Sequence, residues 1–134
     1  MKQTIIVSGI LLKDNKVFLA KRPLTKKIAP GKYHLPGGHV EYGEHPAETL
    51  RREFEEEFKL SVQVGKLVNV FSYHNEEVHT VGVTYSVSCG DIPEEIWFDA
   101  KDTESVLWAD KQQVGEIIEP SDHDYKTIDI FFSS

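Results

Sequence analysis

The stretch from Gly38 to Leu60 constrains this chain more than any other part of its sequence. It reads GHVEYGEHPAETLRREFEEEFKL and holds seven carboxylates against three basic residues. So much negative charge in a short segment repels itself unless water solvates it or a cation neutralises it. Because Mg²⁺ and Mn²⁺ prefer carboxylate oxygens, the stretch indicates either a solvated acidic surface or a divalent metal site.

Residues 46–58 are predicted to form an amphipathic helix. Pro46 suits the first helical turn, where its missing N–H costs nothing. Apolar residues then recur at steps of three and four, which places them on one face for a core. These residues are Ala47, Leu50, Phe54 and Phe58.

Three carboxylates of the same helix, Glu53, Glu56 and Glu57, follow a three-and-four spacing of their own. They form a ridge beside the apolar stripe and converge on a volume the size of a metal cluster. The alternative is a solvated face with local ion pairs such as Arg52–Glu56, each contributing ~0.2–0.5 kcal/mol.

The residues before the helix, GKYHLPGG at 31–38, end in two adjacent glycines. Glycine lets another group approach the main chain closely. Together with the helix, this constellation resembles the Nudix box: Gly, five residues, Glu, seven residues, Arg-Glu, an aliphatic or aromatic residue, any residue, Glu-Glu, any residue, Gly and an apolar residue. The matching residues are Gly38, Glu44, Arg52, Glu53, Phe54, Glu56, Glu57 and Leu60.

One position departs from the Nudix pattern, because Lys59 stands where the family usually has glycine. That glycine normally ends the helix in a left-handed conformation. We expect a slightly altered helix exit and no loss of chemistry, since no charged ligand is missing.

The resemblance implies a site for Mg²⁺, with Mn²⁺ as a substitute. The implied metal ligands are Glu53, Glu56, Glu57 and the main-chain carbonyl of Gly37. Arg52 is expected to orient a carboxylate by paired hydrogen bonds, and Glu53, Arg52 and Glu56 are the expected catalytic residues. For the general base we favour Glu53, with a carboxylate from residues 94–104 as the rival. Gly38 and Glu44 are expected to have structural roles within the motif.

Three residues outside the motif are candidates for substrate contact. Arg22 and Lys27 belong to a basic segment that either binds phosphate or is simply solvated. Tyr33 stands where the family often has Trp, and it could stack on a base or pack beneath the glycine turn. Packing is the interpretation we favour, and Trp108 is likewise expected in the core.

The resemblance implies hydrolysis of a nucleoside diphosphate linked to a further group. The compact length favours a nucleoside triphosphate, cleaved to a monophosphate and pyrophosphate. A nucleotide sugar, a dinucleotide or coenzyme A is the alternative substrate, since the segment from Leu19 to Gly38 partly fits the coenzyme A-type spacing. A non-catalytic nucleotide-binding Nudix module is the alternative of another class.

Composition limits the remaining possibilities. The 134 residues suffice for one domain, expected to span 1–134, but not for two. The net charge of −7 argues against a nucleic-acid polymer as partner, and no apolar run is long enough for a membrane span. Cys89 is the only cysteine, so cytoplasmic residence is the default expectation. We expect a monomer or homodimer.

The order of the expected elements indicates an α+β fold. Alternating and β-branched segments predict strands over 4–12, 17–21, 61–72, 78–88 and 106–109, and further helices are expected over 111–118 and 122–132. Strands on both sides of a central helix suit α+β better than a doubly wound sheet. The resemblance adds a mixed β-sheet sandwiched between α-helices, which is the Nudix fold.

Overall fold

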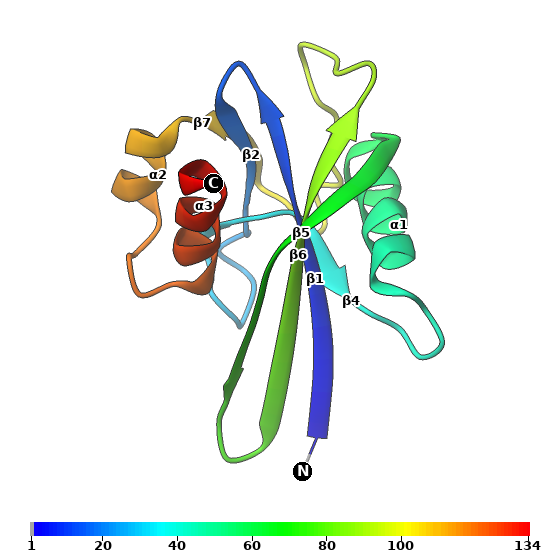
Figure 1. Ribbon diagram of the computed structural model, residues 1–134, viewed down its shortest axis with the longest axis vertical. Coiled ribbons are helices and arrows are strands. Elements are labelled where there is room, and N and C mark those ends of the chain that lie inside the picture. The colour runs from blue at the N-terminus through cyan, green and yellow to red at the C-terminus, as the bar shows by residue number, and fades with distance from the viewer. Residues whose placement is uncertain (1) are drawn as a thin grey trace.

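The computed structural model describes residues 2–134, which form a mixed sheet with helices on both faces (Figure 1). The strands are β1 (Lys2–Lys13), β2 (Lys16–Lys21), β3 (Tyr33–His34), β4 (Gly37–His39), β5 (Val62–His74), β6 (Val78–Cys89) and β7 (Ser105–Ala109). The helices are α1 (Pro46–Phe58), α2 (Lys111–Ile117) and α3 (His123–Ser133). The predicted α+β class and sandwiched sheet are thereby confirmed.

The sheet follows the order β3-β2-β1-β6-β5, with β4 paired to β1 and β7 paired to β2. Strand β1 runs parallel to β6 and antiparallel to β2 and β4. All five predicted strands are present. The short strands β3 and β4 were not predicted, because two or three residues carry no detectable periodicity.

Two cores lie on opposite faces of the sheet. Neighbouring strand residues point to opposite faces, so Leu11 packs in the core beneath α1 while Ile10 packs in the core beneath α2 and α3. In the α1 core, Phe54 and Leu50 are fully buried and lie over Gly9, where a Cβ would come within 3.0 Å of the Phe54 ring. This close approach fixes the distance between α1 and the sheet.

Helix α3 positions the turn that leads into β4. The buried carboxylate of Asp124, in the first turn of α3, accepts a hydrogen bond from the Leu35 backbone N–H at 3.0 Å. Leu35 itself is buried in the core beneath α2 and α3. The hydrogen bond to Asp124 and the burial of Leu35 therefore fix the position of the chain just before Gly37.

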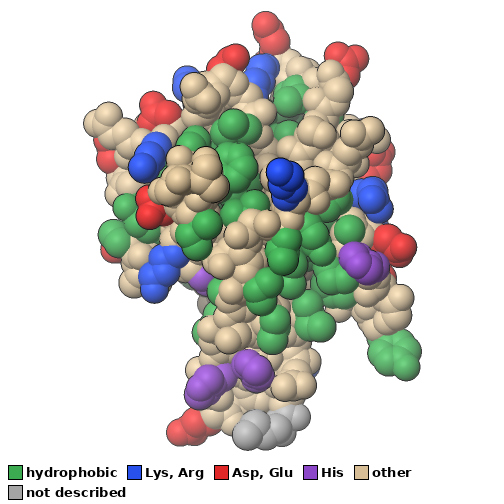
Figure 2. Space-filling model, in the orientation of Figure 1, with side chains coloured by type: hydrophobic (Ala, Val, Ile, Leu, Met, Phe, Trp, Pro, Cys, Tyr) green, Lys and Arg blue, Asp and Glu red, His purple; other side chains and the backbone are tan. Residues whose placement is uncertain are grey.

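Figure 2 shows hydrophobic side chains gathered over the middle of one face, with most charged side chains towards the rim. The end strand β5 contributes Leu67 and Val70, each 55% exposed. No helix within residues 2–134 has the length and the apolar run that a membrane crossing requires.

Candidate metal and phosphate site

Helix α1 begins and ends with defined caps. The His45 side chain accepts a hydrogen bond from the Ala47 N–H at 3.0 Å, and Pro46 occupies the first turn. At the other end Lys59 adopts the left-handed conformation, with φ 53° and ψ 36°. Its N–H donates to the Glu55 carbonyl at 3.0 Å. The helix thus ends as a glycine would end it, so the altered exit that the sequence suggested is not seen.

Arg52 connects the carboxylates on the outer side of α1. Its Nε and Nη2 donate to the two oxygens of Glu44, each at 3.0 Å, in a paired geometry. Nη1 lies 3.3 Å from carboxylate oxygens of both Glu53 and Glu56. One guanidinium therefore binds three acidic side chains, and its role in orienting a metal-binding carboxylate stays a prediction.

Glu44 is a structural anchor with four hydrogen-bond donors. Besides Arg52, it accepts from the Thr49 hydroxyl at 2.9 Å and the Glu41 N–H at 3.0 Å. The Arg52 hydrogen bonds, followed by the Glu41 N–H, lower the pKa of Glu44 to about 2. Glu44 thus joins the loop before α1 to the helix itself.

The two adjacent glycines are required by close contacts on either side of β4. A Cβ on Gly37 would lie 1.9 Å from the Val7 carbonyl oxygen of the paired strand β1. A Cβ on Gly38 would lie 2.6 Å from the carboxyl carbon of Glu53. The absence of side chains therefore brings the β4 backbone and the Glu53 carboxylate together.

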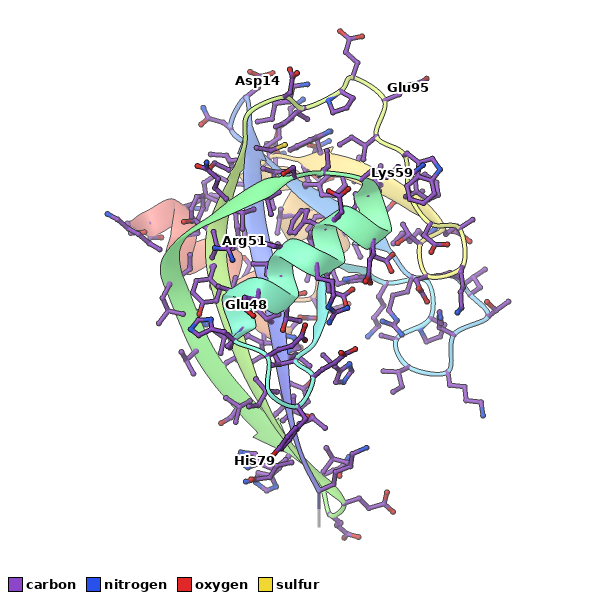
Figure 3. All side chains as sticks on the ribbon, turned by 90° about the vertical axis from the view of Figure 1, so that its right-hand side faces the viewer. Asp14, Glu48, Arg51, Lys59, His79 and Glu95 are labelled. Carbon is purple, nitrogen blue, oxygen red and sulfur yellow. The ribbon has the colours of Figure 1, made fainter. Side chains whose placement is uncertain are left out.

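A cavity of about 310 Å³ opens between α1, β4 and the loops before β3 and β7. Its lining combines carboxylates, backbone and cations: Arg22, Lys26, His34, Gly37, Gly38, Glu41, Glu53, Glu57 and Asp102 are among the residues that form it. Burial raises the pKa of Glu53, and nearby Glu56 also acts in this direction against the lowering effect of Arg52. Figure 3 turns α1 towards the viewer, and the labelled Glu48 and Arg51 lie on this solvent-facing helix.

A second set of carboxylates meets Glu57 from the loop before β7. The Asp99 N–H donates to the Glu57 carbonyl at 2.9 Å, which docks this loop on the end of α1. Carboxylate oxygens of Glu57, Asp99 and Asp102 lie within 4.8 Å of one another. Burial and the neighbouring Asp102 raise the pKa of Glu57 to about 7. The Lys26 ammonium lowers the pKa of Asp102.

The donor set fits a hard divalent cation. Glu53 and Glu57 line the same cavity as the Gly37 backbone, and Asp99 and Asp102 add further carboxylate oxygens at Glu57. Burial first, and then the neighbouring carboxylate of Asp102, raise the pKa of Glu57. Glu56 lies differently, since its side chain is 57% exposed and faces Arg52.

The three residues expected to contact substrate lie in different places. Arg22 lines the cavity, and its Nε donates to the Ile28 carbonyl at 2.8 Å. Lys27 is exposed on the loop. Tyr33 packs against the core beneath α2 and α3, which agrees with the packing interpretation. Trp108 packs 5.1 Å from the Phe18 ring in the α1 core.

The sequence did not single out His34, Asp99 or Asp102, and Lys26 was expected only as part of the basic segment around Arg22 and Lys27. A carboxylate from 94–104 was expected as a rival base, and Asp99 and Asp102 lie in that segment. The segment has no periodicity, so nothing in the sequence shows which of its side chains turn inwards. His34 lines the cavity, and burial lowers its pKa, which favours the neutral imidazole.

The fold and the cavity together define an α+β protein with a carboxylate-rich site suited to a divalent cation and an anionic ligand. The NUDIX domain family matches residues 2–129, and the chain therefore belongs to the Nudix family. The predicted family is confirmed.

Curated relatives share part of the chain. An "ADP-ribose pyrophosphatase" of Methanocaldococcus jannaschii is 36% identical over 83 residues, covering 60% of this chain and 48% of the relative. An "8-oxo-dGTP diphosphatase" of Proteus vulgaris is 33% identical, covering 58% and 70%. A "CTP pyrophosphohydrolase" of Escherichia coli is 36% identical, covering 58% and 55%. The match thus spans about half the length of the archaeal relative. The names denote hydrolases of acid anhydrides, the enzyme class predicted from the sequence.

Solved structures share the fold over nearly the whole chain. A NUDIX hydrolase from Nitrosomonas europaea superposes with a TM-score of 0.81 at 16% identity, covering 98% of this chain and 89% of that one. A MutT NUDIX hydrolase from Burkholderia pseudomallei gives 0.78 at 20% identity, covering 100% of both chains. At these identities the likeness concerns the fold.

Proposed function

We propose that this protein is a Mg²⁺-dependent pyrophosphohydrolase that converts a nucleoside triphosphate to a monophosphate and pyrophosphate. The observation that carries the proposal is the cavity where Glu53, Glu57 and Asp102 face the same space as the Gly37–Gly38 backbone and Arg22. Carboxylates for a cation and a guanidinium for phosphate oxygens are thus present in one cavity.

Glu53, Glu57 and the Gly37 carbonyl would hold the metal, with Asp99 and Asp102 as additional carboxylates at Glu57. Bound Mg²⁺ would supply charge neutralisation at phosphate oxygens and a lowered pKa for water. Glu56, also expected as a ligand, reaches such a site only if its side chain leaves Arg52.

Glu53 is the proposed general base. It accepts the proton of the attacking water while the phosphoanhydride bond breaks and pyrophosphate leaves. Its carboxylate is held on one side by Arg52 and lies against Gly38 on the other, so its position is defined. Asp102, from the 94–104 segment, is the alternative base, since it lines the same cavity.

The preference for a triphosphate rests on relatives named for 8-oxo-dGTP and CTP, which are 33% identical over 79 residues and 36% identical over 78 residues. The relative named for ADP-ribose supports the alternative, a diphosphate that joins a nucleoside to another group. Arg22, which lines the cavity, is the proposed phosphate contact, and Lys27 is a second, exposed cation on the same loop. The location in the cytoplasm and the monomeric or dimeric state stay predictions.

The test is a substrate panel of nucleoside triphosphates, dinucleotides, nucleotide sugars, ADP-ribose and coenzyme A. Each is incubated with Mg²⁺, with Mn²⁺ and with chelator, and the release of pyrophosphate and monophosphate is measured. We expect metal-dependent pyrophosphate release from triphosphates. Faster turnover of ADP-ribose or a nucleotide sugar than of every triphosphate would favour the alternative substrate. Metal binding without turnover of any substrate would favour the non-catalytic module.

A further inference from the structure

The loop between β2 and β3, residues 22–32, is closed at its base by backbone hydrogen bonds. The Arg22 N–H donates to the Lys32 carbonyl at 2.9 Å, and the Gly31 N–H donates to the Arg22 carbonyl at 3.0 Å. Two apolar side chains of the loop, Leu24 and Ile28, are 73% and 76% exposed. Burial of apolar surface therefore contributes little to holding the outer part of this loop.

Lys26 joins the outer part of this loop to the site. Its Nζ donates to Asp102 Oδ1 at 2.8 Å, across a separation of 76 residues in the sequence. Lys26 and Asp102 both line the cavity. This ion pair is a direct link between the 22–32 loop and the loop before β7.

The carboxylate that Lys26 binds belongs to the acidic group formed by Glu57, Asp99 and Asp102, whose oxygens lie within 4.8 Å of one another. In the absence of a metal, the Lys26 ammonium supplies positive charge to this group. A divalent cation bound by these three carboxylates would carry twice that charge and would repel the ammonium at close range. Occupation by the metal and the Lys26–Asp102 bond are therefore in competition.

We propose that Lys26 is a cation-displaced latch: its ammonium holds the 22–32 loop to Asp102 in the metal-free protein, and a divalent cation at Glu57, Asp99 and Asp102 releases it. The proposal rests on the metal site of the proposed function and goes beyond it, because it couples metal binding to the position of a loop. In the metal-free structure, Lys26 lines the cavity together with Arg22.

A competing role and a supporting role of Lys26 predict opposite changes in metal affinity when the residue is replaced. Removing a supporting residue weakens metal binding, whereas removing a competing cation strengthens it. We measure Mn²⁺ affinity by isothermal titration calorimetry on the full chain without nucleotide, comparing the parent with Lys26→Met, Lys26→Arg and Lys27→Met. Lys27→Met removes the same charge from the exposed neighbouring position, so it controls for long-range electrostatics.

We expect Lys26→Met to bind Mn²⁺ about twofold to fivefold more tightly than Lys27→Met, because loss of a partly exposed ion pair changes the binding free energy only modestly. Lys26→Arg, which keeps a cation, should resemble the parent. Equal affinities of Lys26→Met and Lys27→Met, or weaker binding by Lys26→Met, would overturn the latch and leave the proposed function intact. Absence of Mn²⁺ binding in the parent would overturn the metal site and the latch together.

Amide hydrogen exchange of residues 22–32 provides an independent measurement. In the parent, Mn²⁺ should increase exchange in this loop, because the Lys26–Asp102 bond is lost. In Lys26→Met, exchange should already be high and should not respond to the metal. Unchanged loop exchange in the Mn²⁺-saturated parent would overturn the proposal.

Discussion

Arg52 fixes the acidic side chains of α1 relative to the loop that precedes this helix. Its guanidinium binds both oxygens of Glu44 and reaches Glu53 and Glu56 at 3.3 Å. A lysine would supply one point charge in place of this planar fork and could not maintain the same set of contacts. Arg52, a cation surrounded by carboxylates, therefore organises this part of the site.

Glu44 gives the protein a measurable dependence on acid. Its pKa is about 2 in the folded state, below the ordinary value of 4.5 that it regains on unfolding. A lowered folded pKa contributes stability above pH 4.5, and this contribution disappears as the pH falls towards 2. We expect Glu44→Gln to lower the free energy of unfolding at pH 7 but to differ little from the parent at pH 2.

Urea denaturation of both proteins at intervals between pH 7 and pH 2 measures this difference. Glu48→Gln, at an exposed position in the first turn of α1, is the control. If Glu44→Gln lost the same stability at every pH, the carboxylate charge would not be the cause.

Gly38 is expected to matter for turnover more than for folding. A Cβ at this position would lie 2.6 Å from the Glu53 carboxyl carbon, so Gly38→Ala must push that side chain away. A displacement of about 1 Å of a reacting group costs on the order of 10²-fold in rate. Gly90→Ala, where a Cβ meets no atom within 4 Å, should keep the parental rate. Steady-state kinetics on the best substrate of the panel checks both variants.

At the scale of elements, helix α1 ends in the left-handed conformation although Lys59 stands where a glycine was expected. Lys59 adopts φ 53°, and its ammonium lies 4.2 Å from the centre of the exposed Trp97 ring. The left-handed conformation costs a residue with a Cβ roughly 1–2 kcal/mol, and a cation–π contact at an exposed site returns about 0.5–1 kcal/mol. The contact with Trp97 thus offsets part of the backbone cost.

Two substitutions at Lys59 separate these effects. Lys59→Ala and Lys59→Gly both remove the ammonium, but only glycine removes the cost of the left-handed backbone. We expect Lys59→Gly to be more stable than Lys59→Ala by about 1 kcal/mol in urea denaturation. Equal stabilities would mean that the backbone relaxes from this conformation when the contact with Trp97 is lost.

At the scale of the whole molecule, the site lies where separate parts of the chain meet. Helix α1 supplies Glu53 and Glu57, β4 supplies the glycine backbone, and the loop before β7 supplies Asp102. These parts are held by the α1 core on one side of the sheet and by the Asp124–Leu35 bond on the other. The two cores therefore set the positions of the site residues as well as the stability of the fold.

Metal binding should stabilise the whole fold through these carboxylates. A ligand that binds only the folded state at one hundred times its Kd adds about 2.7 kcal/mol to the free energy of unfolding. We expect Mn²⁺ to raise the Tm of the parent and of Glu55→Gln, whose exposed side chain lies on the same helix. Glu57→Gln should show little rise, and its turnover should fall by orders of magnitude.

Without metal, Glu57→Gln should be no less stable than the parent, because the substitution removes the cost of burying the Glu57 charge and relieves its repulsion by Asp102. Differential scanning calorimetry with chelator and with Mn²⁺ measures both effects. A full metal-induced rise of Tm in Glu57→Gln would remove Glu57 from the proposed ligands.

The sequence by itself determined the local features of this protein. Spacing within 46–58 predicted the helix, its buried face and its carboxylate ridge, since these depend only on helical geometry. The fixed spacing from Gly38 to Leu60 predicted the family. Alternation predicted the longer strands, and an Asp14-Asn15 turn with positive φ values joins the first two.

Only the tertiary structure decided which distant residues meet. Asp99 and Asp102 reach Glu57 because the loop before β7 docks on the end of α1, and Lys26 reaches Asp102 across 76 residues. The neighbouring carboxylates of α1 also have different surroundings, because Glu57 lines the cavity whereas Glu56 faces Arg52. Helical periodicity gives the relative angle of neighbouring side chains, but the surroundings of each one depend on how separate elements pack together.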